Sequence, residues 1–173
     1  MTKLDLQYIA DYEDCKMGRF ETTGDDGGVT VNILIDNYSE GFPSEGECFM
    51  EICGLGYNIE VYKTEEEFDA AHSDFKMAVP SMIPIGTFSA VEEAAEEDPR
   101  ILFTGKVFGF ETDPEAEGND PNHLIHIDTY GFDFHLYTKY DGNLEAGDIL
   151  HGVAWLYGDL IFNDTKEGEE NVK

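Results

Sequence analysis

The spacing of apolar and polar residues predicts that this chain is built mainly from β-strands. From Val29 to Asp36, apolar side chains recur at every second position, which is typical of a strand with one buried face. The runs 47–53 and 57–62 alternate in a similar way and are separated by Gly54-Leu55-Gly56. Because glycines favour tight turns, we expect these two runs to form a hairpin.

The second half of the chain has stronger strand character. Apolar runs predict strands over 101–110 and 149–162, and a hairpin formed by 123–129 and 132–140 around Tyr130-Gly131. Glycines within strands mark bends. The two longer runs are interrupted by Gly105, Gly109, Gly152 and Gly158. We therefore expect the sheet of this half to coil into a small barrel.

A helical segment separates the strands in the middle of the chain. Thr64 is followed three residues later by Glu67, which is the capping-box pattern of a helix start. Apolar residues then recur near helical spacing, so we expect a helix over 64–78. A second, short acidic helix is expected over 89–97.

Two short sequences in the second half resemble strand signatures of the OB-fold, a five-stranded β-barrel. Thr104-Gly105-Lys106-Val107 resembles the opening of the first strand. Leu144-Glu145-Ala146-Gly147-Asp148-Ile149, with Gly152-Val153 after it, resembles the entry into the fourth. The resemblance spans about 100–162 and implies an OB-like barrel there. It implies no activity, because one fold hosts many functions.

The predicted fold class is α+β and mostly β, with antiparallel strands, an OB-like barrel in the C-terminal half and one or two short helices in the middle. We divide the chain into an N-terminal α+β half over 1–98, an OB-like β half over 99–164 and a frayed acidic tail over 165–173. The alternative is that the two halves form one continuous compact fold. A chain of 173 residues suits either arrangement.

The charge balance narrows the range of partners. The chain has 10 Lys and Arg residues against 38 Asp and Glu residues, a formal net charge of −28 at pH 7, and both halves are acidic. Because 41% of the residues are hydrophobic, the chain still has the material for a folded core. An acidic surface repels nucleic-acid phosphates and anionic lipid, and it attracts cations and basic proteins. We therefore expect neither a nucleic-acid nor a membrane partner.

Cysteine usage and the N-terminus predict a cytoplasmic protein. Cys15, Cys48 and Cys53 are odd in number and lack Cys-x-x-Cys spacing, so we expect reduced, mostly buried thiols. The first residues show no signal-peptide pattern, and no run approaches the ~18 apolar residues of a membrane span.

The predicted hairpin of 123–140 creates a candidate metal site. A two-residue turn pairs His126 with His135, and it pairs Asp128 with Asp133 on the same face of the sheet. The opposite, inward face receives Ile125, Ile127, Phe132, Phe134 and Leu136. Directly opposed Cβ atoms lie ~4.5–5.5 Å apart, so the imidazoles and a carboxylate could share zinc, manganese or iron. The alternative is a hydrated face on which the histidines hydrogen-bond to carboxylates.

The sequence contains no recognisable catalytic motif. It lacks a Gly-x-Ser-x-Gly elbow and a phosphate-binding glycine loop. The acidic loop 113–120 fails as an EF-hand because Leu124 stands where calcium requires a glutamate. We therefore lean towards a protein without enzymatic activity and expect no organic cofactor. A divalent metal is the one cofactor for which the sequence offers ligands.

Four aromatic residues of the second half are candidate contact residues. They are Tyr137, Tyr140, Trp155 and Tyr157. Aromatics on an OB-like sheet can stack on single-stranded nucleic acid, but such binding requires a basic groove. The stretch 101–162 contains only Lys106 and Lys139 as bases. We therefore expect these aromatics to contact protein or a neutral ligand, or to pack in the core.

These observations favour a non-enzymatic protein-binding or accessory domain whose acidic surface steers a basic partner. A sharper form of this hypothesis is a nuclease inhibitor or a mimic of nucleic-acid charge. Its rival is a β-barrel that binds a metal or small ligand, with a hydrolase at the His126/His135 cluster as one form. A third interpretation assigns the acidity to solubility alone, without any partner.

Overall fold

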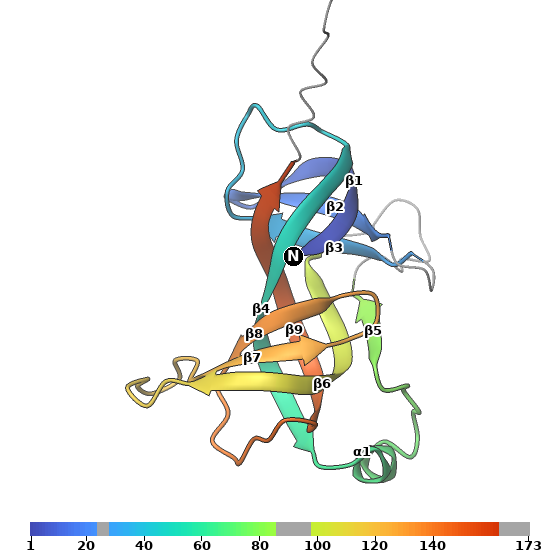
Figure 1. The fold of residues 1–173 in the computed structure, drawn as a ribbon, viewed down its shortest axis with the longest axis vertical. Helices are drawn as coiled ribbons and strands as arrows, with labels where there is room; N and C mark the ends of the chain where they lie inside the picture. Colours follow the sequence, from blue (N-terminus) through green and yellow to red (C-terminus); the bar gives the residue numbers. More distant parts are fainter. Residues whose placement is uncertain (24–27, 86–97, 163–173) are drawn as a thin grey trace, which may run out of the picture.

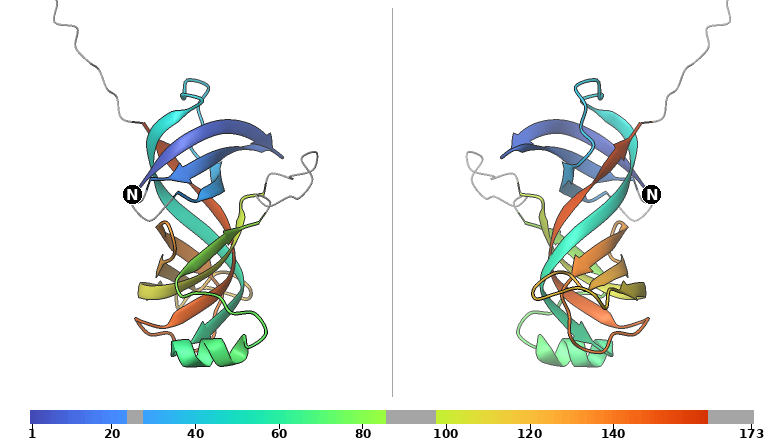
Figure 2. Two further views of the ribbon diagram at one scale, coloured as in Figure 1. Left: turned by 90° about the vertical axis from the view of Figure 1, so that its right-hand side faces the viewer. Right: turned by 90° about the vertical axis from the view of Figure 1, so that its left-hand side faces the viewer.

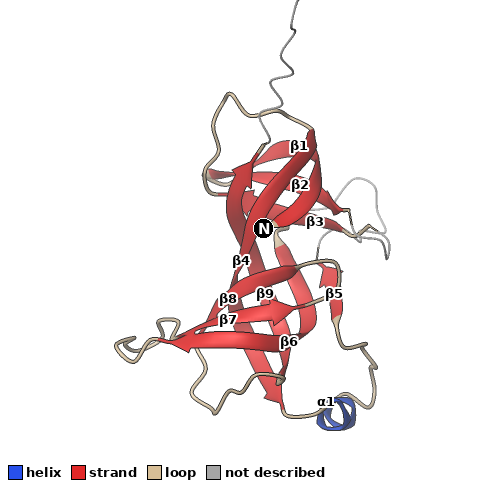
Figure 3. Ribbon diagram, in the orientation of Figure 1, coloured by secondary structure: helices blue, strands red, loops and turns tan. Residues whose placement is uncertain are grey.

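The structure is a computed structural model that describes residues 1–23, 28–85 and 98–162. Strands dominate it, and α1 is the one helix within these residues (Figure 3). The elements are β1 (Thr2–Tyr12), β2 (Cys15–Thr22), β3 (Thr30–Ile35), β4 (Gly46–Tyr62), α1 (Glu65–Ala71), β5 (Ser81–Pro84), β6 (Arg100–Thr112), β7 (His123–Asp128), β8 (Asp133–Thr138) and β9 (Ile149–Ile161). The mostly β composition agrees with the sequence-based prediction.

The strands pair in two closed rings. The sheet has the order β1-β2-β3-β9-β4-β8-β7-β6-β5, with further pairings of β1 with β4 and of β9 with β6. The pairing of β1, β2, β3, β9 and β4 therefore returns to β1, and that of β9, β4, β8, β7 and β6 returns to β9. In Figure 1 the strands β1–β3 lie at one end of the long axis and β5–β8 towards the other. The long strands β4 and β9 run through both groups, as the side views in Figure 2 also show.

The sequence predicts antiparallel strands, but two of the strand pairings are parallel. Ring closure explains this difference. Strand β3 pairs with β9 in parallel, and β4 pairs with β8 in parallel. In a closed ring of five strands the direction cannot alternate all the way round, because the number is odd. Each ring consequently needs at least one parallel pair, and each contains one.

The predicted hairpin around Gly54-Leu55-Gly56 is wrong, because β4 continues through both glycines as one strand paired with β9. The glycines are needed for close packing instead. A Cβ on Gly54 would lie 2.9 Å from Phe134 Cε2, and one on Gly56 would lie 2.8 Å from Leu136 Cδ1. Leu55, between them, therefore lies on the outer face of a long strand and is 48% exposed.

The register of the β7–β8 hairpin agrees with the prediction. His126 pairs with His135, and Asp128 pairs with Asp133. All the residues predicted to point inward are buried: Ile125, Ile127, Phe132, Phe134 and Leu136. A shift by one residue would have exposed this apolar set, and the alternation of the sequence therefore determines the register.

The inward faces of both rings share one apolar core. It includes Leu4 and Phe20 from the first ring and Phe103 and Phe134 from the second. A smaller cluster of Phe68, Met77 and Ile149 lies apart from it and contains the buried side chain of α1. Packing of Phe68 in this cluster holds the helix near the far ends of β4 and β9 (Figure 1).

The start of α1 has one of the two bonds of the predicted capping box, because the Glu67 backbone N–H donates to Thr64 Oγ1 over 3.2 Å. Glu67 Oε2 accepts from the backbone N–H of Lys63, the residue before the cap, over 2.9 Å. The helix ends at Ala71 and is therefore shorter than the predicted 64–78. The second helix expected over 89–97 and the tail over 165–173 lie outside the described residues.

Among the described residues, no helix is long and apolar enough to cross a membrane.

The three cysteines differ in their environments. Cys48 is buried, Cys53 is half-buried and Cys15 is exposed, and all three are free thiols. Burial raises the pKa of the Cys48 thiol to about 11, so this thiol is protonated at neutral pH.

Candidate functional site

The outer face of β7, β8, β4 and β9 carries an uninterrupted row of apolar side chains. Leu124 pairs with Tyr137, Tyr137 with Leu55, and Leu55 with Trp155, so one residue from each strand lies beside the next. Leu55 is 48% exposed and Tyr137 is 38% exposed, and the other two are half-buried. We call these four residues the aromatic row.

The indole of Trp155 is held at the end of the aromatic row. Its ring lies edge-on to Tyr12 at 6.4 Å between centroids, and the Arg100 guanidinium lies over it at 5.5 Å. Asp98 forms an ion pair with Arg100. Burial alone would raise the pKa of Asp98, but the hydrogen bonds from Arg100 outweigh it, so this pKa lies below its ordinary value. The positive charge that lies over Trp155 is therefore already paired with a carboxylate.

An acidic pocket opens further along the same face of β4 and β9. It has a volume of about 210 Å³ and is lined by the carboxylates of Asp36, Glu51 and Asp159, together with Cys53 and Tyr157. Burial, followed by the charge of Asp159, raises the pKa of Asp36. Met1 also lines this pocket, and Glu51 Oε1 faces His135 Nδ1 over 3.7 Å. We call Asp36, Glu51 and Asp159 the acidic pocket.

The two neutral groups in this pocket stay protonated at neutral pH. Burial raises the pKa of Tyr157 to about 12, with a smaller contribution from Cys53. Burial also raises the pKa of the Cys53 thiol. The pocket therefore presents three carboxylates beside an uncharged phenol and an uncharged thiol, which is an environment suited to a cation.

The histidines of the predicted metal site lie between the aromatic row and the acidic pocket. The rings of His126 and His135 stack at 4.9 Å between centroids. His126 Nε2 lies 2.6 Å from Asp133 Oδ2, and His135 Nδ1 lies 3.7 Å from Glu51 Oε1. Although partial burial acts in the other direction, the hydrogen bond with His126 lowers the pKa of Asp133. Each imidazole thus faces a different carboxylate.

Metal ligation by His126, His135, Asp128 and Asp133 stays a prediction. Within the described part of the chain, a single group of at least three potential ligands has all its donor atoms within 4.8 Å of one another. That group contains none of these four residues. His126 is hydrogen-bonded to Asp133, whereas His135 lies at ion-pair distance from Glu51.

The four predicted contact aromatics separate into two groups. Tyr137 and Trp155 belong to the aromatic row, and Tyr157 lines the acidic pocket on the same face. Tyr140 packs against the main core, and its backbone N–H donates to Asn122 Oδ1 over 2.9 Å. Sequence reasoning missed Leu55 because its neighbouring glycines indicated a turn.

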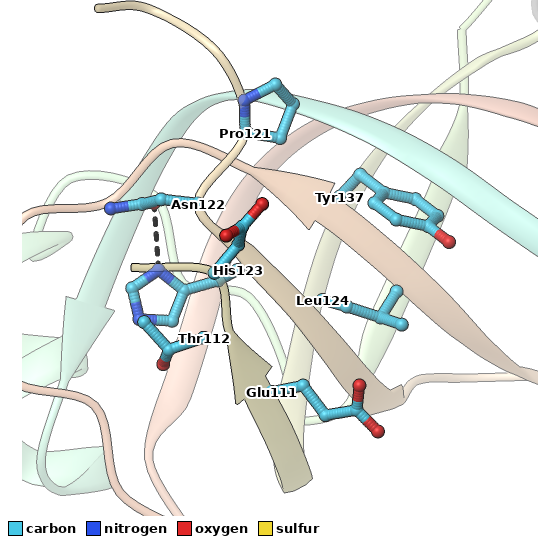
Figure 4. A pocket seen from close by; sticks show the side chains of 8 residues that line it. Glu111, Thr112, Pro121, Asn122, His123, Leu124 and Tyr137 are labelled. Atoms are coloured by element: carbon cyan, nitrogen blue, oxygen red, sulfur yellow. Dashed lines mark hydrogen bonds between the residues drawn. The ribbon is translucent and has the colours of Figure 1, made fainter. Parts of the chain in front are cut away.

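A shallow pocket of about 240 Å³ adjoins the aromatic row at the ends of β6 and β7. Figure 4 shows Leu124 and Tyr137 on one side of it and His123 with Asn122 on the other. His123 Nδ1 lies 2.8 Å from Asn122 Oδ1, and burial lowers the pKa of this histidine. The pocket extends the accessible surface of the row and offers mostly uncharged lining beside Glu111 and Asp113.

Comparisons with known proteins add no identification. No family model matches the chain, and neither the curated proteins nor the solved structures contain a match to it.

Proposed function

We propose that this protein is a non-enzymatic protein-binding domain that docks a basic segment of its partner on the outer face of β7, β8, β4 and β9. The aromatic row contacts apolar side chains of that segment, and the acidic pocket receives a Lys or Arg side chain. The observation that carries this proposal is the presence of the row and the pocket on one sheet face. Leu55 of the aromatic row and Glu51 of the acidic pocket are four residues apart on β4, which corresponds to about 13 Å along the strand.

The aromatic row is suited to supply contact energy. Tyrosine and tryptophan are enriched among the residues that dominate protein interfaces, because each buries a large area and loses few rotamers. Trp155 is already held between Tyr12 and Arg100, so binding costs little ordering of its side chain. Leu55 and Tyr137 are the exposed members that a partner would cover.

Charge selects a basic partner. The bases of the second ring already face acids, because Arg100 pairs with Asp98, Lys106 with Glu65 and Lys139 with Asp141. In the acidic pocket, Glu51 faces His135 over 3.7 Å, whereas no ion pair with Lys or Arg is seen for Asp36 or Asp159 among the described residues. The net charge of −28 adds a long-range field that accelerates encounter with a positive protein and repels a nucleic acid. A nuclease inhibitor or a mimic of nucleic-acid charge would be a special case of this function.

The ring of β6, β7, β8, β4 and β9 supports the OB-like interpretation of the C-terminal half. It has five strands, as an OB-fold barrel has, and OB-folds bind their ligands across the second and third strands. In this ring those strands are β7 and β8, which carry Leu124 and Tyr137. Because β4 and β9 belong to both rings, we infer that the two halves form one continuous fold.

A peptide array tests the proposed face directly. Overlapping peptides from basic proteins are probed with the wild type, with Leu55→Ser and with the matched control Phe75→Ser, which removes a 60% exposed side chain outside the face. We expect bound peptides to combine Lys or Arg with a large apolar residue about four positions away, the separation that spans ~13 Å. Binding should weaken in Leu55→Ser and persist in Phe75→Ser. Equal binding by both variants would contradict the proposal.

A further inference from the structure

Three potential metal ligands from separate elements meet at the end of the molecule that α1 occupies. Glu60 and His151 are directly paired residues of β4 and β9. His72 follows the last residue of α1 and is its C-cap. One donor atom of each residue lies within 4.8 Å of those of the other two, and this is the one such group in the described part of the chain.

Local backbone features bring these residues together. The pairing of β4 with β9 shifts between Tyr57 and Glu60, and Asn58 within that irregularity has a φ of 54°. The shift determines which side chains of β4 share a face with His151. Thr64 starts α1 directly after β4, and one short helix then places His72 over the end of the sheet.

Each of the three side chains is oriented by a second contact. The Tyr62 hydroxyl donates to Glu60 Oε2 over 2.7 Å. His72 Nδ1 lies 3.0 Å from the Phe68 carbonyl oxygen, and His151 Nδ1 lies 3.1 Å from Thr104 Oγ1. Because a carbonyl oxygen only accepts, His72 Nδ1 is the donor in this contact, which leaves Nε2 as the nitrogen that faces Glu60 and that would ligate a metal. Outer contacts of this kind are what hold ligating histidines in metal sites.

The two imidazoles pack against the apolar ring of Phe68. The Phe68 ring, which is fully buried, lies 4.5 Å from the His72 ring and 5.6 Å from the His151 ring between centroids. The imidazole centroids themselves are 4.9 Å apart. Both histidines are half-buried, whereas Glu60 is exposed, so the cluster is open to solvent from one side.

We propose that Glu60, His72 and His151 bind one zinc ion. Two imidazole nitrogens and one carboxylate oxygen are a ligand set that zinc takes, with water in the fourth position of a tetrahedron. Calcium and magnesium prefer oxygen ligands alone, so the imidazoles select against them. The site requires modest side-chain movement, because His72 Nε2 is already 3.4 Å from Glu60 Oε2.

A histidine–glutamate ion pair alone would not explain the arrangement. Such a pair needs only His72 and Glu60. His151 also has a donor atom within 4.8 Å of theirs, and its Nδ1 is in contact with Thr104 Oγ1. The hairpin histidines provide the contrast, since His126 and His135 each face a different carboxylate. The same residue types are thus arranged for separate ion pairs at one place and for a shared ligand at the other.

Zinc titration of the full chain against a chromophoric chelator tests the proposal. The titration is run with excess Mg²⁺ and at about 1 M NaCl, where the Debye length is ~3 Å, so that diffuse attraction to the acidic surface is suppressed. We expect one zinc ion per chain. His72→Gln and His151→Gln should each weaken zinc binding by at least about tenfold.

Two further variants keep the outcome interpretable. Glu60→Gln changes an exposed side chain and should fold normally while weakening zinc binding. His126→Gln is the matched control and should bind zinc as the wild type does. Cobalt substitution adds a spectroscopic readout, with visible bands of a nitrogen and oxygen site and no thiolate charge-transfer band. Zinc binding that survives in His72→Gln and Glu60→Gln, or that is lost in His126→Gln, would overturn the proposal, as would no binding by the wild type.

Discussion

At the scale of single residues, Arg100 shows how a base can lie beside the aromatic row without opposing a basic partner. Its guanidinium covers Trp155 and at the same time pairs with Asp98. The charge is neutralised, while the planar group still supports the indole. This pair also connects the binding face to the stability of the fold, because Asp98 is mostly buried.

The Asp98–Arg100 pair predicts a pH-dependent loss of stability. The pKa of Asp98 is lowered in the folded protein, so its stabilising effect is present above the pKa of the unfolded chain and is lost as the pH falls through the folded pKa. Asp98→Asn should lower the free energy of unfolding by about 1 kcal/mol at neutral pH. Urea unfolding at pH 7 and about pH 3 should show the difference shrinking as the carboxylate is protonated. A difference that is equal at both pH values would contradict this assignment.

The strand pairing of the two hairpin histidines could be predicted from single residues. Alternation in 123–138 determined which side chains point inward, so the pairing of His126 with His135 could be predicted. It could not predict the cluster of Glu60, His72 and His151. These residues come together through a strand irregularity and a helix end, and neither leaves a periodic signal in the sequence.

At the scale of elements, β4 is the strand that sequence reasoning misread most. Glycines at 54 and 56 have the local signature of a turn, yet they are required by the close approach of Phe134 and Leu136 from another strand. Such contacts are long-range, so a local pattern cannot distinguish them from a turn. The sequence pattern predicts no element for the β1–β2 hairpin. Its two strands mix polar and apolar residues.

Close approach of β4 and β9 predicts that Gly158 tolerates no side chain. A Cβ there would lie 2.4 Å from the backbone oxygen of Glu51, which cannot move without disturbing β4. Gly158→Ala should therefore destabilise the protein by about 1–3 kcal/mol. Gly109→Ala is the control, since a Cβ there meets no atom within 4 Å. Equal unfolding midpoints in urea for the two variants would show that the approach is not as close as described.

The short helix α1 predicts a link between its capping residue and the zinc site. Thr64→Ala removes the acceptor of the Glu67 backbone N–H and should cost about 1 kcal/mol. Because α1 positions His72, zinc affinity should fall with it. Thr64→Ser keeps the hydroxyl and should behave as the wild type in both thermal melting and zinc titration. Unchanged zinc affinity in Thr64→Ala would contradict this link, because it would show that the helix cap does not affect the position of His72.

At the scale of the whole molecule, two five-stranded rings share β4 and β9 and enclose one core. The sequence predicted a mostly β fold and the strands of the second ring. It could not reveal that β4 closes that ring through its pairing with β8, because this pairing joins residues about 80 positions apart, such as Cys53 and His135. The acidic pocket was hidden for the same reason, since Asp36, Glu51 and Asp159 come from three strands or their ends.

The overall charge predicts opposite effects of salt on folding and on binding. At a net charge of −28 the acids repel one another in the folded state, and screening by salt relieves that repulsion. The melting temperature should therefore rise between low and moderate NaCl concentration in a thermal melt without divalent ions. Partner binding should weaken over the same range, because its steering is electrostatic. A melting temperature that falls with added NaCl would contradict the first part.

A comparative affinity capture from the cells that make the protein shows whether this sheet face is the docking surface. Wild type, Leu55→Ser and Phe75→Ser are used as baits at low and high salt, and retained proteins are quantified by mass spectrometry. We expect a basic protein that is held by the wild type and by Phe75→Ser, is depleted on Leu55→Ser and is released by salt. A partner that is retained equally by Leu55→Ser and the wild type, or one that is not basic, would contradict the claim that this face is the docking surface.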